Sequence, residues 1–197
     1  MINEAQVQDA LRKLVDPNTG KDFVATRSAR NIKVAGSDVS LDIELGYPGK
    51  SQQEPNRRQV IQALKAAGAG NVTANVSSKV VAHAVQRGVK LVPGIKNIIA
   101  VASGKGGVGK STTAVNLALA LAAEGASVGM LDADIYGPSQ PMMLGIAGRP
   151  ESKDGKRIEP MEGHGLQASS IGFLIDIDTP MVWRGPMVTQ EIGRAHV

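Results

Sequence analysis

The chain has 197 residues, of which 42% are hydrophobic, 20% are charged and only 3% are aromatic, and its formal net charge is +4. This length allows one full core and a smaller second one, built mainly from aliphatic side chains. Lysine and arginine are dispersed, without the basic tracts typical of nucleic-acid binders, so we expect no nucleic-acid partner. No apolar run reaches the length of a membrane span, and the first residues lack the layout of a signal peptide. We therefore expect no membrane partner and a cytoplasmic location.

The first 79 residues have the pattern of a small α+β domain. Apolar residues at helical spacing predict a helix that buries Val7, Leu11, Leu14 and Val15, and the turn-forming residues 16–20 end it. The following patterns predict a strand, a strand, a helix and a strand: Asn31–Ala35, Val39–Leu45, Gln59–Ala67 and Asn71–Ser77. This set can close its own core, so we expect residues 1–79 to fold alone. Residues 80–96, with Pro93-Gly94 near their end, are the expected linker.

A phosphate-binding loop follows the linker. Residues Gly104–Ser111 fit the pattern G-x-x-x-x-G-K-[ST], after the apolar run Ile98–Val101, an expected strand, and before Thr112–Ala123, an expected helix. Glycines let the backbone N–H groups turn inward as an anion nest, and the helix adds its positive end. The alternative is an ordinary glycine-rich turn. Residues Gly104, Lys105, Gly106, Gly107, Val108, Gly109, Lys110, Ser111 and Thr112 are the expected nucleotide-binding set.

The loop predicts ATP and Mg²⁺ as cofactors. Lys110 would lie along the β- and γ-phosphates, and the Ser111 hydroxyl would ligate Mg²⁺. Further on, the short apolar strand that begins at Val128 runs into Asp132 and Asp134. Because ligands gather beyond the carboxyl ends of parallel strands, we assign Asp132 to the outer shell of the metal and Asp134 to orienting the attacking water. The alternative is a solvated pair of carboxylates at a strand end.

The second lysine of the loop, Lys105, narrows the class of protein. The run Gly-Lys-Gly-Gly-Val-Gly-Lys-Ser resembles the deviant Walker A motif of the MinD/ParA/nitrogenase iron protein group. The resemblance implies that Lys105 reaches the nucleotide of a partner subunit and acts as a catalytic cation in a nucleotide-dependent homodimer, by the logic of an arginine finger. A solvated loop lysine is the alternative.

Three segments together resemble the Mrp/ApbC iron–sulfur cluster carrier ATPases: Gly104–Ser111, Leu131–Ser139 and Met181–Met187. The resemblance extends to about Gln190, and the first domain resembles the PaaD-like domain that often precedes such ATPases. It implies an ATP-hydrolysing protein that holds a [4Fe–4S] cluster between two subunits and passes it to apo-proteins. A ParA/MinD-like positioning switch is the alternative from another class, and a nucleotide-binding fragment without activity is a third.

The chain departs from that family in one respect: it has no cysteine, and thiolates are the usual cluster ligands. The family's C-x-x-C pair and Walker-B-like aspartate are expected beyond residue 197, so the cluster belongs to the complete protein only. Residues 191–197 do not resemble the family and are interpreted as a foreign tail after a C-terminal truncation. The fold class is therefore α/β: residues 97–190 form an incomplete P-loop NTPase parallel sheet, preceded by the small α+β domain.

The remaining conspicuous side chains favour structural roles. His83, His164 and His196 lack the spacing of metal ligands, and His164 is expected in a turn. We expect Met142-Met143 to form a flexible core or dimer face, with a soft partner-binding surface as the alternative. We expect the single Trp183 to be a buried anchor or a subunit contact.

Overall fold

A computed structural model describes residues 2–83, 92–153 and 157–174 of the chain. The chain divides into two compact units, Met1–Ile98 and Ile99–Val197. Trp183, His196 and the expected tail 191–197 lie outside the described residues. Within the described ranges, no helix is both long and apolar enough to cross a membrane.

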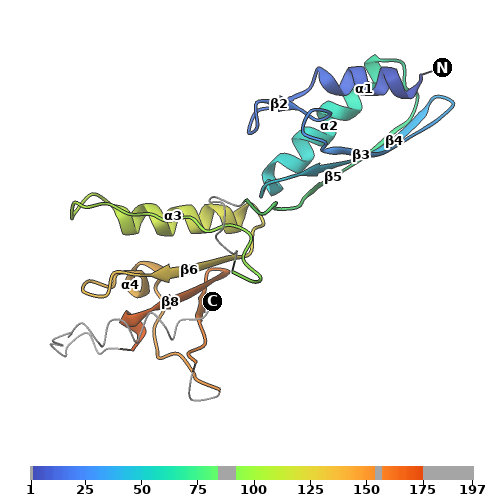
Figure 1. Ribbon diagram of the computed structural model, residues 1–197. Coiled ribbons are helices and arrows are strands. Elements are labelled where there is room, and N and C mark those ends of the chain that lie inside the picture. The colour runs from blue at the N-terminus through green and yellow to red at the C-terminus, as the bar shows by residue number, and fades with distance from the viewer. Residues whose placement is uncertain (1, 84–91, 154–156, 175–197) are drawn as a thin grey trace. The chain divides into compact units, whose positions relative to one another are not determined.

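The first unit is a three-stranded sheet packed on two helices (Figure 1). The sheet has the order β3-β4-β5, in which β3 and β4 are antiparallel and β4 and β5 are parallel through the crossover helix α2. A separate two-stranded pair, β1–β2, follows α1. The elements are α1 (Glu4–Arg12), β1 (Val15–Asp16), β2 (Lys21–Asp22), β3 (Ala29–Ala35), β4 (Asp38–Leu45), α2 (Lys50–Ala66) and β5 (Val72–Ser78).

The first helix begins with a reciprocal cap. The Asn3 side chain accepts a hydrogen bond from the Gln6 N–H, and the Gln6 side chain accepts one from the Asn3 N–H. Val7 and Leu11 are fully buried, as predicted. The prediction that Val15 shares their face is wrong, because α1 ends at Arg12 and Val15 lies in β1 with 56% of its surface exposed.

The second helix is longer than the apolar pattern predicted. The residues that α2 buries are Asn56, Val60 and Leu64. Because Asn56 is polar, the spacing of apolar residues does not reveal the first part of this helix. Pro55, which usually disfavours a helix interior, also lies within α2. The strands β3, β4 and β5 were predicted to within two residues, helped by the alternation of buried and more exposed positions in β4, whereas the short strands β1 and β2 were not predicted.

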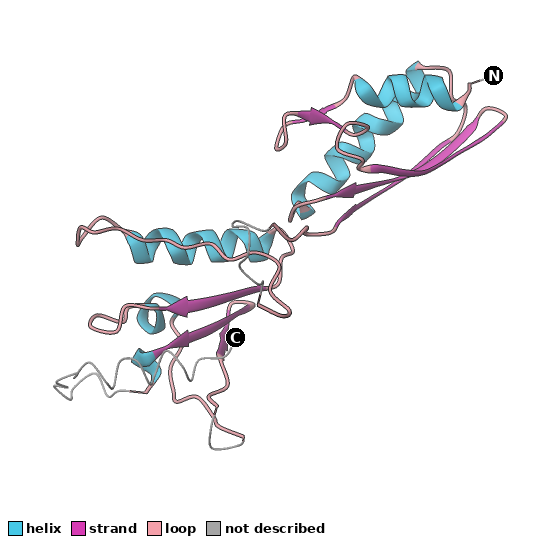
Figure 2. Ribbon diagram, viewed as in Figure 1, coloured by secondary structure: helices cyan, strands magenta, loops and turns pink. Residues whose placement is uncertain are grey.

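The second unit packs helix α3 against a mixed sheet of the order β6-β8-β7 (Figure 2). β6 and β8 are parallel, and β7 joins β8 as an antiparallel hairpin. His164 and Gly165 make its two-residue turn with φ of 53° and 75°, which confirms the turn predicted at His164. The elements are α3 (Lys110–Ala123), β6 (Val128–Asp132), α4 (Gln140–Leu144), β7 (Met161–Gly163), β8 (Leu166–Ser170) and the 3-10 turn η1 (Ile171–Phe173).

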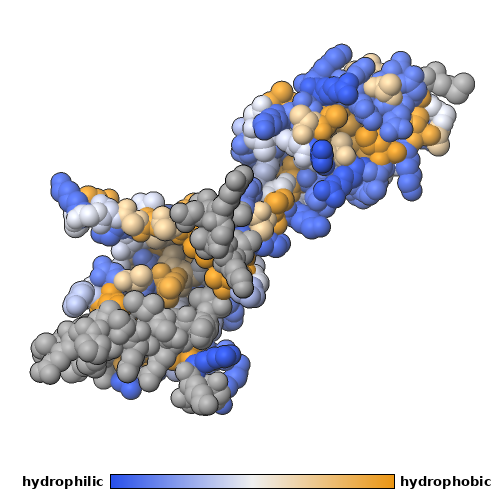
Figure 3. Space-filling model, viewed as in Figure 1, coloured by the Kyte–Doolittle hydropathy of each residue, from blue (hydrophilic) through white to orange (hydrophobic). Residues whose placement is uncertain are grey.

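Alternation places the core of this unit on one face of the sheet. Met130 of β6 and its register partner Ala168 of β8 pack with Val115 and Ala118 of α3. Leu131 points to the other face and is half exposed. Because only one face of the sheet is covered by α3, hydrophobic residues are also exposed on the surface of this unit (Figure 3).

The strand expected over Ile98–Val101 is wrong for this structure. These residues have no regular secondary structure, and Ile98 and Ile99 are exposed. A β-strand is stabilised by hydrogen bonds to a neighbouring strand, and Ile98–Val101 pairs with no strand of the described sheets. The apolar, β-branched sequence therefore has a high strand propensity but no neighbouring strand to which its main chain could form hydrogen bonds.

Candidate functional site: a glycine loop and a carboxylate junction

The loop before α3 curls through two left-handed residues. Gly107 has φ of 71° and Gly109 has φ of 85°, a region that side chains with a Cβ rarely adopt. Gly109 is the N-cap residue of α3, and its carbonyl oxygen accepts from Thr113 N at 2.9 Å. No side chain caps this end of α3, and its first turn holds no acidic residue. The initial N–H groups of α3 are thus available to an anion.

The glycines leave the concave side of the loop open. A Cβ added at Gly104, Gly106, Gly107 or Gly109 would have no heavy atom within 4 Å. The main chain can therefore approach a ligand closely at these positions. A phosphate group fits this arrangement, because it accepts hydrogen bonds from several main-chain N–H groups at once.

The two lysines of the loop differ in placement. Lys110 is the first residue of α3, and its Nζ donates to the Lys105 carbonyl oxygen at 3.5 Å, so that its side chain reaches back across the loop. Lys105 is exposed, and its main-chain N–H donates to Ser103 Oγ at 3.2 Å. Ser111 follows Lys110 in the first turn of α3 and is half-buried, whereas Thr112 is exposed.

Asp132, the last residue of β6, joins three segments. Its Oδ2 accepts from Ser170 Oγ at 3.1 Å and from Gln140 N at 3.2 Å, and its Oδ1 accepts from Asp134 N at 3.1 Å. We call these four residues the carboxylate junction. The junction fixes the carboxyl end of β6 to the end of β8 and to the start of α4.

Asp134 lies outside the strand. The prediction that Asp132 and Asp134 share a face as residues of one extended strand does not hold, because β6 ends at Asp132 and the chain turns at once. Asp134 is exposed, and its Oδ1 accepts from Gly137 N at 3.1 Å. Tyr136, two residues further along, is 78% exposed.

Gln140 and Ser170 were missed by the sequence analysis. Gln140 is buried, and its Nε2 donates to the Ser111 carbonyl oxygen at 3.4 Å, which links the junction to the first turn of α3. Ser170 ends β8 directly opposite Asp132 in the parallel register. No local pattern in the sequence indicated Ser170, because its position opposite Asp132 follows from the register between β6 and β8.

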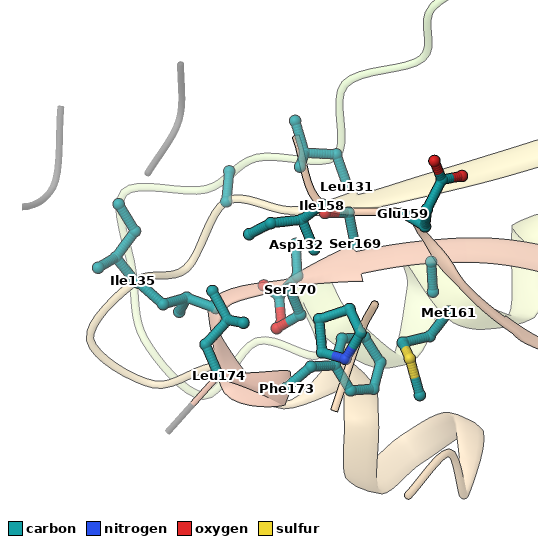
Figure 4. Close-up of a pocket in the computed structure, with 14 residues that line it drawn as sticks. Leu131, Asp132, Ile135, Ile158, Glu159, Met161, Ser169, Ser170, Phe173 and Leu174 are labelled. Atoms are coloured by element: carbon teal, nitrogen blue, oxygen red, sulfur yellow. The ribbon is translucent and has the colours of Figure 1, made fainter. Parts of the chain in front are cut away.

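A mainly apolar cleft adjoins the junction (Figure 4). Asp132 and Ser170 lie at the polar part of its wall, and Ile135, Phe173 and Leu174 are among the apolar lining residues. None of residues 104–111 lines this cleft. Residues 104–109 of the glycine loop are exposed, and the cleft is a separate feature.

The other singled-out residues lie away from this site. His83 donates its main-chain N–H to Asn97 Oδ1 at 3.1 Å in the linker region, and a ring nitrogen of His164 lies 2.9 Å from the Leu144 carbonyl oxygen. Met142 is 80% exposed, so a core role for it is wrong. In the part of the chain that the structure describes, no group of histidine and acidic side chains is arranged to hold a metal ion.

Two family models match the chain, and together they cover both units. The ParA model, described as NUBPL iron-transfer P-loop NTPase, matches residues 94–195. The model described as iron-sulfur cluster assembly protein matches residues 4–77.

Curated relatives point the same way. An iron–sulfur cluster carrier protein of Haemophilus influenzae is 42% identical over 191 residues, which are 96% of this chain and 52% of the relative. The carrier protein of Escherichia coli K12 is 50% identical over 166 residues, 81% of this chain and 44% of the relative. An Arabidopsis thaliana protein named as an iron–sulfur protein required for NADH dehydrogenase, mitochondrial, is 52% identical over 102 residues, 51% of this chain and 33% of the relative.

The chain spans about half the length of the bacterial relatives that it matches. The residues matched by the cluster assembly model lie within the first unit, and the glycine loop and the carboxylate junction lie within the residues matched by the NTPase model. The chain therefore belongs to the ParA family of NUBPL-type iron-transfer P-loop NTPases and carries an iron–sulfur cluster assembly domain in front of its P-loop unit.

Proposed function

We propose that this chain is the nucleotide-handling part of an ATP-dependent iron–sulfur cluster carrier. The observation that carries the proposal is the uncapped start of α3 behind the left-handed Gly107 and Gly109, within the residues matched by the iron-transfer NTPase model. This arrangement favours an anion nest. The matched relatives named as carriers favour this function over the positioning switch that the loop alone leaves open. A cytoplasmic location stays a prediction.

The loop residues bind the triphosphate in this proposal. Main-chain N–H groups of residues 104–112 surround the β- and γ-phosphates, and Lys110 neutralises their charge as α3 adds its positive end. The Ser111 hydroxyl would hold Mg²⁺, an ion that needs few protein ligands. When bound, Mg²⁺ supplies neutralisation of phosphate charge.

The two aspartates have different tasks. Asp132 is engaged by three donors of its own chain, which suits a residue that organises the metal's outer shell rather than one that binds the ion directly. Asp134 is exposed and retains an oxygen for a water molecule, so it orients the nucleophile for hydrolysis. Lys105 acts from the loop of one subunit on the nucleotide of the other, in a homodimer.

The cluster itself is cargo that passes to apo-protein clients. This chain has no cysteine, so the thiolate ligands of a [4Fe–4S] cluster belong to a part of the carrier other than these 197 residues. The role of the first unit within the carrier is docking or structural support.

A chimera tests the carrier function. Residues 1–174 of this chain are joined to the downstream part of the E. coli relative and produced in a bacterial strain that lacks its own carrier. We expect restored activity of an iron–sulfur enzyme, and no restoration by the same chimera with Lys110→Ala. A folded chimera that binds ATP but restores nothing would contradict the carrier function, and equal restoration by both would contradict the role of the loop.

A further inference from the structure

Gln140 contacts both halves of the proposed nucleotide site. Its main-chain N–H donates to Asp132 Oδ2 at 3.2 Å, and its side-chain Nε2 donates to the Ser111 carbonyl oxygen at 3.4 Å. One residue at the start of α4 thus bridges the end of β6 and the first turn of α3. Only 4% of its surface is exposed.

The Gln140 side chain also has an acceptor without a partner. Its Oε1 is buried and has no hydrogen-bond partner among the described residues, and neither has the Oγ of the preceding Ser139. Rotating the side-chain amide so that its O and N change places would not give Oε1 a donor. Oε1 would then face the Ser111 carbonyl oxygen, which is another acceptor. A buried amide oxygen without a donor costs free energy, so its presence beside a ligand site indicates a task there.

We propose that Gln140 is a positioning residue that couples metal loading at Ser111 to the segment 132–140. Its Nε2 holds the first turn of α3, its N–H holds Asp132, and its Oε1 accepts a hydrogen bond from a water molecule bound to Mg²⁺. This rests on the proposed function, because it takes Ser111 as the metal ligand. The segment between Asp132 and Gln140 contains Asp134, so the same contact sets where the water-orienting carboxylate lies when the metal is bound.

Three variants of the whole chain separate these contacts. Gln140→Met has similar volume and flexibility but neither donor nor acceptor. Gln140→Glu keeps acceptor oxygens and loses the donor to Ser111. Gln167→Met makes the same chemical change at an exposed glutamine of β8 that bonds Glu162 at 3.3 Å, and it serves as the control.

Calorimetry measures ATP affinity across a Mg²⁺ titration and in excess chelator, and urea unfolding is measured without nucleotide. We expect Gln140→Met to need about tenfold more Mg²⁺ for half-maximal ATP binding, the loss of about one hydrogen bond to a metal-bound group. Its affinity in chelator should change less than about twofold, and its nucleotide-free stability should equal or exceed that of the parent, because the unpartnered oxygen is gone. Gln140→Glu should keep a Mg²⁺ requirement near that of the parent and lose stability, because its carboxylate faces the Ser111 carbonyl.

Two results would overturn the proposal. A Mg²⁺ requirement for Gln140→Met equal to that of the parent and of Gln167→Met would exclude a link to the metal. Equal loss of affinity with and without Mg²⁺, together with lower stability, would make Gln140 a structural residue only. If the parent itself bound no ATP, the proposed function would fail, and that outcome is distinct because it precedes any effect of the variants.

Discussion

Ser170 and Asp132 end neighbouring parallel strands at the same register position, and the Ser170 hydroxyl donates to Asp132 Oδ2 at 3.1 Å. Ser170 is buried, and its Oγ also accepts from Gly172 N at 3.1 Å. The carboxyl ends of β6 and β8 are therefore tied together where ligands of a parallel sheet bind. The position of Asp132 depends on a strand that lies 38 residues further along the chain.

Ser170→Ala should destabilise the second unit by about 1–3 kcal/mol, because a buried hydrogen bond to a carboxylate and the cap of η1 are both lost. Urea unfolding followed by circular dichroism measures the change. Ser169→Ala, on the other face of β8, is the matched control and should change stability by less than about 0.5 kcal/mol. Equal effects of the two substitutions would refute a special role for the Ser170–Asp132 bond.

Asp134→Ala, tested in the chimera with the downstream part of the E. coli relative, should bind MgATP with an affinity close to that of the parent and lose most of its turnover. The reason is that an exposed carboxylate beyond the end of β6 can orient water but does not bind phosphate.

Asp132→Ala should instead raise the Mg²⁺ requirement and lower stability, because three donors lose their acceptor. Phosphate release and calorimetry together check the split, and parental turnover by Asp134→Ala would make that residue structural.

Tyr47 should give the first unit a dependence on alkaline pH. Its hydroxyl donates to both oxygens of the buried Asp16 at 2.9 Å. Burial is the main cause that raises the pKa of Tyr47 above its ordinary value near 10; the hydrogen bond to Asp16 and the Asp16 charge add to it, and the hydrogen bond from Asn18 opposes it. Below pH 10 the tyrosine is protonated in both states and the stabilisation is complete. As the pH rises through the folded-state pKa, the unfolded chain has already released its proton, so stability falls.

A fragment of residues 1–83 is suited to this measurement, because every residue of the first core lies within it. We propose that it unfolds cooperatively by itself. Tyr47→Phe should cost about 1–3 kcal/mol at pH 7, since Asp16 stays buried with fewer donors, and should lose less further stability than the parent above pH 10. Parallel pH profiles of the fragment and its variant, followed by circular dichroism, would contradict this account.

The chain should hold no [4Fe–4S] cluster alone. With no cysteine in 197 residues and three histidines, it offers no set of thiolates to four irons. Anaerobic incubation with iron and sulfide, followed by desalting and an iron count, should leave substoichiometric iron that a chelator removes. A stoichiometric, chelator-resistant cluster would mean that other side chains ligate it.

The sequence correctly predicted the features that depend on interactions between residues close together in the chain. The Gly104–Ser111 loop and the helix that follows it were predictable, because left-handed glycines and a helix start depend on neighbouring residues. The strands β4 and β6 were predictable from alternation and apolar content. Ile98–Val101 shows the limit, since strand propensity does not form a strand without a partner.

The contacts around Asp132 were beyond local patterns. Ser170 and Gln140 meet it from β8 and α4, and Gln140 meets Ser111 across 29 positions of sequence. Such hydrogen bonds follow from the register between strands and from the turn after Asp132, and neither feature can be predicted from a short stretch of sequence. The polar Asn56 in the buried stripe of α2 is a similar case, because tertiary packing overrode its polarity.

The most direct test of the central claim, that the loop before α3 binds the phosphates of a nucleotide, is calorimetry of MgATP with the purified chain and with Lys110→Ala. The account predicts measurable binding by the parent and a loss of about 2–4 kcal/mol in the variant, because a close charge-assisted contact disappears. Lys105→Ala, in the same loop but proposed to act on a partner subunit, should change affinity by less than about threefold. Equal affinity of the parent and Lys110→Ala would contradict the account.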